Sequence, residues 1–158
     1  MKKKKIKIIV GVLVLLIVGV SGVAYYMFNM PHRNIQETNT DFSISSSEIV
    51  NEYLADATIA NEKYLEEEGN SKILAVTGKI FSISEDQNNQ KVVLLKGPSD
   101  KAGVSCTFTA VTNAHTKDLK LGQTITVKGV IRSGAGFDED LDLYEDIIME
   151  KCDIINQK

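Results

Sequence analysis

The sequence has no tryptophan and only two prolines, two cysteines and two histidines among its 158 residues. Two cysteines exclude a scaffold built from several disulfides, although they suffice for one bridge in an oxidising compartment. One histidine, His32, stands in a polar stretch where a metal site would need partner ligands that are not nearby. The missing tryptophan weakens the case for a site that stacks sugar rings.

No acidic residue occurs before Glu37. Five of the eighteen basic residues are lysines within residues 1–7, so thirteen basic and twenty-one acidic residues remain, a net charge of −8. An acidic body repels phosphate backbones, which argues against nucleic acid as the main partner.

Residues 8–28, IIVGVLVLLIVGVSGVAYYMF, form a run of twenty-one residues without a charge. About twenty apolar residues span a bilayer as a helix. The lysines before the run place residues 1–7 in the cytoplasm by the positive-inside rule. The pattern predicts a single-pass anchor in a bacterial inner membrane, with the domain in the periplasm or outside the cell. A cleaved signal peptide is the alternative, with a cleavage site at Gly22-Val23-Ala24. No cysteine lies near the end of the run, which excludes a lipid-modified lipoprotein.

Residues 29–43 are polar and predict a linker between the anchor, residues 1–28, and a domain over residues 44–156. Ser45 and Glu48 have the spacing of a capping box and predict the start of a helix over residues 46–68, ending at Gly69. Its apolar residues recur every three to four positions, which favours packing on the domain's own barrel. These residues are Ile49, Tyr53, Ala57, Ala60 and Tyr64.

Five segments have the alternation or the short apolar runs of strands. Two of them contain a glycine, Gly78 and Gly129, at which the strand is expected to bend. In the third segment every second residue points inward, and in the fourth Thr124, Thr126 and Lys128 are expected to point outward. The segments are residues 72–85, 91–96, 104–109, 123–131 and 147–155, with a short helical connector at 113–121.

This order predicts a mainly β fold with some α: a five-stranded OB-fold Greek-key barrel preceded by an amphipathic helix and an N-terminal transmembrane helix. The stretches AVTGKI, GVSCTF, LKLGQTITVKGVI and EKCDII, behind a capped helix, resemble the tRNA anticodon-like OB-fold family of exported and membrane-anchored bacterial proteins. The resemblance covers about residues 42–156. It implies an envelope protein, supplies no catalytic residues and does not establish RNA binding.

The third and fifth strands of an OB-fold are neighbours, and Cys106 and Cys152 lie in the middle of these two strands. The resemblance also pairs a cysteine in each strand, so a disulfide between them is expected if both side chains share a face. Two buried free thiols are the alternative. A redox-active pair is disfavoured, because a catalytic dithiol needs close spacing and an exposed thiolate.

Six of the nine residues from 138 to 146 are acids. They lie between strands four and five, in a loop that OB-folds use for ligands. The predicted ligand residues are Asp138, Asp140, Asp142, Tyr144 and Glu145. The three aspartates have the alternate spacing of calcium loops, but Leu143 stands where an EF-hand needs glycine, so calcium is only a weak alternative to a solvated acidic loop.

No catalytic constellation and no cofactor are expected, so the chain is interpreted as a binding module and not an enzyme. It is expected to contact the bilayer through residues 8–28 and to bind an envelope protein or glycan. The alternative is an oligonucleotide- or oligosaccharide-binding protein that uses the barrel face and residues 134–144. Nucleic acid is disfavoured because the third strand presents serine and threonine outward, where stacking needs aromatic residues.

Overall fold

The computed structural model describes residues 16–26, 35–65 and 71–155. The chain divides into two compact units, residues 1–33 and 34–158. In the first unit, residues 16–26 form a helix whose apolar side chains are mostly exposed. Within the described residues no helix has both the length and the apolarity to cross a membrane. The predicted span over residues 8–28 lies partly outside the described residues.

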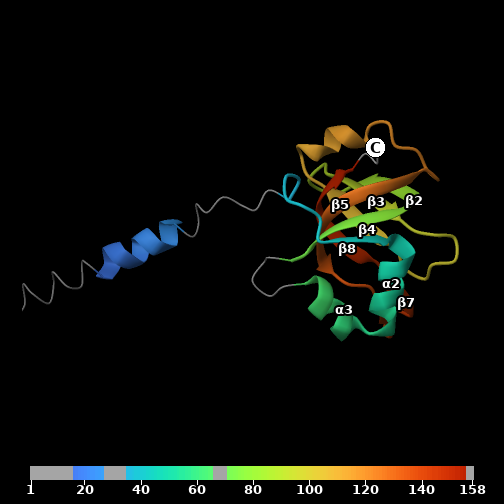
Figure 1. Cartoon of the computed structure of the whole chain (residues 1–158), viewed down its shortest axis with the longest axis horizontal. Coiled ribbons are helices and arrows are strands. Elements are labelled where there is room, and N and C mark those ends of the chain that lie inside the picture. The colour runs from blue at the N-terminus through green and yellow to red at the C-terminus, as the bar shows by residue number, and fades with distance from the viewer. Residues whose placement is uncertain (1–15, 27–34, 66–70, 156–158) are drawn as a thin grey trace, which may run out of the picture. The chain divides into compact units, whose positions relative to one another are not determined.

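The second unit is a closed five-stranded barrel (Figure 1). Its strands pair in the order β2, β3, β4, β8 and β5, and β5 pairs with β2 to close the cylinder. The contact between β4 and β8 is parallel, and the other four are antiparallel. This is the Greek-key order of the OB-fold, as predicted. The strands are β2 (Ile73–Glu85), β3 (Lys91–Leu95), β4 (Val104–Phe108), β5 (Thr124–Ser133) and β8 (Ile147–Ile154).

The long strand β2 serves two neighbours. Its first half, residues 73–79, pairs with β5, and its second half, residues 80–85, pairs with β3. The register shifts between Ile80 and Ser82, so the bulge lies at Phe81 and not at Gly78, where the β2–β5 register is regular. Gly78 is needed for another reason: a Cβ there would lie 2.5 Å from the hydroxyl oxygen of Ser46. The predicted irregularity at Gly129 is confirmed by a shift between β5 and β8.

The predicted single helix is two helices, α2 (Ser46–Ala55) and α3 (Ala57–Tyr64). Ser45 caps α2 as predicted, its hydroxyl accepting from the N–H of Glu48 at 3.2 Å. The break lies at Asp56, whose carboxylate accepts from the N–H groups of Thr58 and Ile59 in the first turn of α3. An aspartate prefers this capping position to a helix interior, which explains the break. The predicted end at Gly69 lies outside the described residues.

The apolar stripe of the helices packs on the barrel as predicted, except at Ala57, which is exposed. Figure 1 shows α2 and α3 at one end of the barrel and the 3-10 helix η1 (Thr112–Thr116), drawn in gold, at the opposite end. The inward residues of β4, which include Phe108, are fully buried as predicted. The hydrophobic core therefore fills the barrel and continues beneath the two helices.

Three short strands were not predicted from the sequence. β1 (Phe42–Ser45) pairs in parallel with β2, and a hairpin of β6 (Gly136–Asp138) and β7 (Leu143–Glu145) occupies the stretch expected to be a loop. The predicted linker reaches the barrel at Ile35, which is buried. Lys128 holds this segment by donating to the backbone carbonyls of residues 36 and 38.

Cys106 and Cys152 are both fully buried and both free, so the expected disulfide is not supported. The β4–β8 register places Cys106 opposite Met149, and places Cys152 opposite Phe108. The two cysteines therefore do not stand directly opposite each other. Burial, and then the neighbouring Cys106 thiol, raise the pKa of Cys152 well above its ordinary value. Both thiols therefore act as small apolar groups in the core.

Candidate functional site

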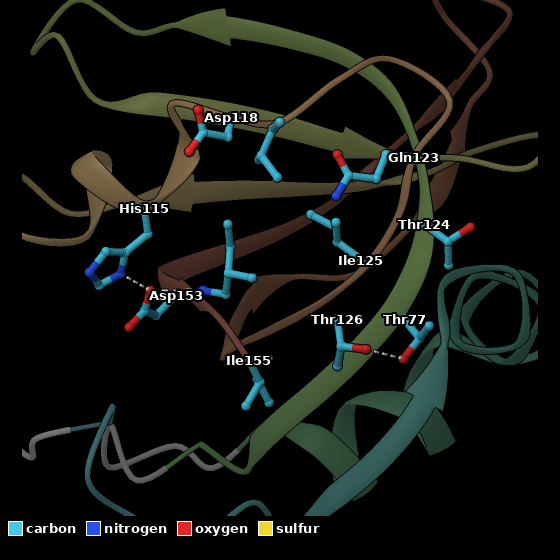
Figure 2. A pocket seen from close by; sticks show the side chains of 11 residues that line it. Thr77, His115, Asp118, Gln123, Thr124, Ile125, Thr126, Asp153 and Ile155 are labelled. Atoms are coloured by element: carbon cyan, nitrogen blue, oxygen red, sulfur yellow. Dashed lines mark hydrogen bonds and ion pairs between the residues drawn. The ribbon is translucent and has the colours of Figure 1, made fainter. Parts of the chain in front are cut away.

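A cavity of about 650 Å³ opens at the end of the barrel beside η1, and is called here the barrel-end cavity (Figure 2). Its volume falls within the range of about 300–1,000 Å³ that is typical of small-molecule sites. Its walls come from β2, β5, β8, η1 and the segment after η1. They consist of Thr77, His115, Asp118, Leu119, Gln123, Thr124, Ile125, Thr126, Asp153, Ile154 and Ile155.

One polar pair on the wall joins His115 and Asp153. The Nδ1 atom of His115 lies 2.6 Å from Oδ1 of Asp153, which also accepts the backbone N–H of Ile154 at 2.8 Å. η1 is fixed to β8 by Thr112, whose hydroxyl donates to the carbonyl of Cys152 at 2.7 Å. The histidine side chain is 56% exposed and the aspartate 21%, so the pair lies at the mouth of the cavity.

A second polar pair joins two threonines on neighbouring strands. The hydroxyl oxygens of Thr77 and Thr126 are 2.8 Å apart, because these residues stand opposite each other in the β2–β5 register. Thr126 was expected on an exposed outer face, but only 8% of it is exposed. Figure 2 shows the two polar pairs on separate parts of the wall, so the cavity offers hydrogen-bonding groups on more than one side.

The chemistry of the wall favours an uncharged or cationic polar ligand. Hydroxyl, amide and carboxylate groups line it together with isoleucine and leucine, and none of its lining residues is a lysine or arginine. The carboxylate of Asp118 has no hydrogen bond or ion pair within the described parts of the chain. His115 bonds to no hydroxyl or thiol there, so the His115–Asp153 pair has no adjacent nucleophile of the kind that acyl transfer requires.

The predicted acidic ligand loop folds into the β6–β7 hairpin. Asp138 uses its carboxylate within the turn, accepting from the N–H groups of Asp140 and Leu141 at 2.9 and 3.0 Å. Asp142 takes a left-handed backbone conformation with φ of 50°. Throughout the described residues no three acidic, histidine or cysteine side chains gather as a metal site would require. The alternate acids therefore do not converge on one point, as calcium ligands must.

Tyr144 and Glu145, the other predicted ligand residues, lie on β7. The ring of Tyr144 packs against Phe137 on β6, with centroids 4.8 Å apart. Its hydroxyl accepts a hydrogen bond from Lys101 at 3.2 Å. Glu145 pairs with Gly136 in the hairpin register. The hairpin therefore brings Tyr144 beside the ring of Phe137 and the ammonium group of Lys101. The carboxylate of Asp138 instead bonds within the turn.

The outer face of β3 and β4 is the surface that many OB-folds offer to single-stranded nucleic acid. Here its facing pairs are Leu94 with Ser105 and Val92 with Thr107, all partly exposed. Neither pair contains an aromatic or basic residue, although base stacking and phosphate binding need these. Phe81, at the β2 bulge, is 61% exposed and is the one strongly exposed aromatic residue of the barrel strands.

The barrel-end cavity was not predicted from the sequence. His115 and Asp153 are separated by 38 residues, and only the position of η1 against β8 brings them together. The alternate threonines of β5, Thr124 and Thr126, could have indicated the cavity wall, but their pattern was interpreted as an exposed face.

Comparisons with known proteins agree with this architecture. The model of the tRNA_anti-like family matches residues 1–140. Among solved structures, a candidate nucleic acid-binding lipoprotein from Klebsiella pneumoniae subsp. pneumoniae is similar, with a TM-score of 0.52 and 13% sequence identity. That match covers 80% of this chain and 100% of the other, and at this identity it shows the fold alone. No curated protein matches the sequence significantly. The family model covers well over half of the sequence, and the chain belongs to the tRNA_anti-like family.

Proposed function

We propose that this protein is a membrane-tethered, extracytoplasmic binding module that performs no catalysis and holds a small polar ligand in the barrel-end cavity. The observation that carries the proposal is the cavity itself, which has the volume of a ligand site and hydrogen-bonding groups on separate parts of its wall. Barrel strands supply about half of its lining, and Thr112 fixes η1, which carries His115, to β8 by a hydrogen bond of 2.7 Å.

The ligand is uncharged or cationic, and a glycan fragment is the first compound to test. Hydroxyl, amide and carboxylate groups can accept and donate to sugar hydroxyls, while Ile125 and Ile154 offer apolar surface to the ring carbons. The carboxylates of Asp118 and Asp153 repel phosphate. The same repulsion, with the net charge of the chain after its lysine cluster, makes nucleic acid the less suitable ligand.

The proposed location rests on the N-terminal pattern. Five lysines precede twenty-one uncharged residues, which is the arrangement of a cytoplasmic flank followed by a bilayer-spanning segment. The similar Klebsiella structure is described as a lipoprotein, and lipoproteins are membrane-attached. This supports an envelope location for the family fold, although the present sequence lacks a cysteine near the end of its apolar run.

The proposal is tested by the melting temperature of the full chain in detergent micelles against three compounds: a neutral cell-wall glycan fragment, a single-stranded oligonucleotide and calcium. A ligand present at a hundred times its dissociation constant adds about 2.7 kcal/mol of stability, which raises the melt by several degrees. We expect the glycan fragment to raise the melt and the other two to leave it unchanged.

The site is then identified with Gln123→Ala, which removes an exposed amide from the cavity wall. The matched control is Gln87→Ala, the same change in the exposed turn between β2 and β3. The first variant should lose most of the glycan-induced shift and the control should keep it. A shift with the oligonucleotide alone, or equal shifts in both variants, would contradict the proposal.

A further inference from the structure

A second cavity, of about 400 Å³, lies between α2 and the β6–β7 hairpin, and is called here the hairpin cleft. It shares no residue with the barrel-end cavity. Its chemistry is different: three aromatic rings and one lysine line it, and no acidic residue does. The lining consists of Tyr53, Leu54, Ala57, Lys101, Ala135, Gly136, Phe137 and Tyr144.

The tyrosine on the buried side of the cleft has a hydroxyl group without a partner. Tyr53 is 2% exposed, and its hydroxyl is buried and makes no hydrogen bond within the described residues. The ring is fixed because it lies against Gly134, where any Cβ atom would overlap it. Burial raises the pKa of Tyr53 to about 12, so the hydroxyl keeps its proton at neutral pH. It remains a hydrogen-bond donor that the protein leaves unused.

The cleft also contains a cation without a carboxylate partner. Nζ of Lys101 lies 3.2 Å from the hydroxyl of Tyr144 and 5.1 Å from the centre of its ring. No carboxylate forms an ion pair with this lysine in the part of the chain that the structure describes. Phe137 beside it is 47% exposed and pairs with Tyr144, so an open aromatic face adjoins the charge.

The surroundings limit the size and charge of a ligand. Residues 138–146, six of which are acids, follow directly from the cleft along the hairpin. Two of these acids lie near the cleft: a Cβ atom at Gly136 would lie 4.0 Å from Oε2 of Glu145, and Asp146 accepts the N–H of Gly103 at 2.6 Å. Their negative charge opposes a chain of phosphates or carboxylates more strongly than a single carboxylate at Lys101. The cleft therefore selects a small ring with one negative group over a polyanion.

We propose that the hairpin cleft is a second binding site, for a small ring-shaped ligand that carries one carboxylate. The carboxylate pairs with Lys101 and the ring packs on Phe137 and Tyr144, while the ring of Tyr53 forms the buried side of the cleft. The ring is either aromatic or a sugar acid, since both satisfy this chemistry. This site is independent of the function proposed for the barrel-end cavity.

The test uses the five tyrosines of the full chain as probes, labelled with ¹³C at Cζ and observed by NMR in detergent micelles. Benzoate and D-glucuronate are titrated separately, with benzamide and D-glucose as their uncharged controls. We expect one or both carboxylates to shift the Tyr53 and Tyr144 signals while Tyr64 stays unchanged. The carboxylate should bind at least ten-fold more tightly than its uncharged control, and the tighter of the two names the ring type.

Two variants assign the interactions. Lys101→Met should reduce carboxylate affinity to within about three-fold of the uncharged control. Phe137→Leu should weaken binding several-fold by removing the ring contact, whereas Phe81→Leu, the same change at the exposed β2 bulge outside the cleft, should not. The proposal is overturned if neither carboxylate moves the Tyr53 signal, if the uncharged controls bind equally well, or if Lys101→Met binds as the unmodified chain does.

Discussion

Two neighbouring tyrosines of the helical layer should respond in opposite directions to loss of the hydroxyl group. Tyr53 and Tyr64 are both almost fully buried, and their rings stack at 6.2 Å. The hydroxyl of Tyr64 donates to the carboxylate of Glu52 at 2.8 Å. The hydroxyl of Tyr53 has no partner within the described residues. Tyrosine to phenylalanine at these two positions is therefore a matched pair in which only the hydrogen bond differs.

The expected changes in unfolding free energy follow from the surroundings of the two tyrosine hydroxyl groups. A buried polar group without a partner costs about 1–3 kcal/mol, and Tyr53→Phe removes that cost while leaving a void of one oxygen atom. We expect unfolding free energy to stay equal or to rise by about 1 kcal/mol. A hydrogen bond to a charged group contributes about 1.5–3 kcal/mol. The side chain of Glu52 is 33% exposed, so water can replace part of the Tyr64–Glu52 hydrogen bond in the variant. Tyr64→Phe should therefore lower the free energy of unfolding by about 1–2 kcal/mol.

The assay is urea unfolding of the full chain followed by circular dichroism, because the sequence has no tryptophan to report by fluorescence. Equal slopes against urea concentration in the two variants would show that only stability has changed. If Tyr53→Phe destabilises the domain as much as Tyr64→Phe, the hydroxyl of Tyr53 has a partner and the reasoning is refuted.

Three further predictions concern the helices and their contact with the barrel. Gly78→Ala should cost about 1–3 kcal/mol, because its Cβ would meet Ser46, and Ser46→Gly in the same chain should recover part of the loss in urea unfolding. Asp56→Ala should cost about 1 kcal/mol by removing the cap of α3, whereas Glu62→Ala should change little in the same measurement. The side-chain hydrogen bond from Lys63 holds the pKa of Glu52 below its ordinary value of 4.5, so this contribution is present above that pH and is lost as pH falls through the lower folded value. The stability difference between the unmodified chain and Glu52→Gln should therefore shrink on acidification, and a difference that persists at pH 2 would contradict this.

The barrel could be predicted from local patterns because its strands alternate clearly. Val104, Cys106 and Phe108 point inward as their spacing requires, and β2 is long enough to serve two neighbours. The position of the β2 bulge could not be read locally, since Gly78 marks a close approach to α2 and the register shifts at Phe81.

Features that depend on contacts between residues far apart in the chain could not be predicted from local sequence patterns. β1 is four residues long and pairs with a strand some thirty residues later, so its pattern carries no usable signal. Asp56 interrupts an apolar stripe that continues past it, and periodicity alone favoured one helix. The site residues were predicted in the acidic hairpin, whereas the barrel-end cavity is built from residues that only the barrel topology brings together.

Binding of a small polar ligand in the barrel-end cavity can be observed by mapping amide and side-chain chemical shifts of the full chain during titration with a neutral cell-wall glycan fragment. We expect saturable shifts confined to the cavity, at Gln123, Thr124, Thr126 and the His115 ring, with the β3–β4 face unchanged. Shifts on the β3–β4 face, or no shifts at millimolar fragment together with saturable shifts from a single-stranded oligonucleotide, would contradict it.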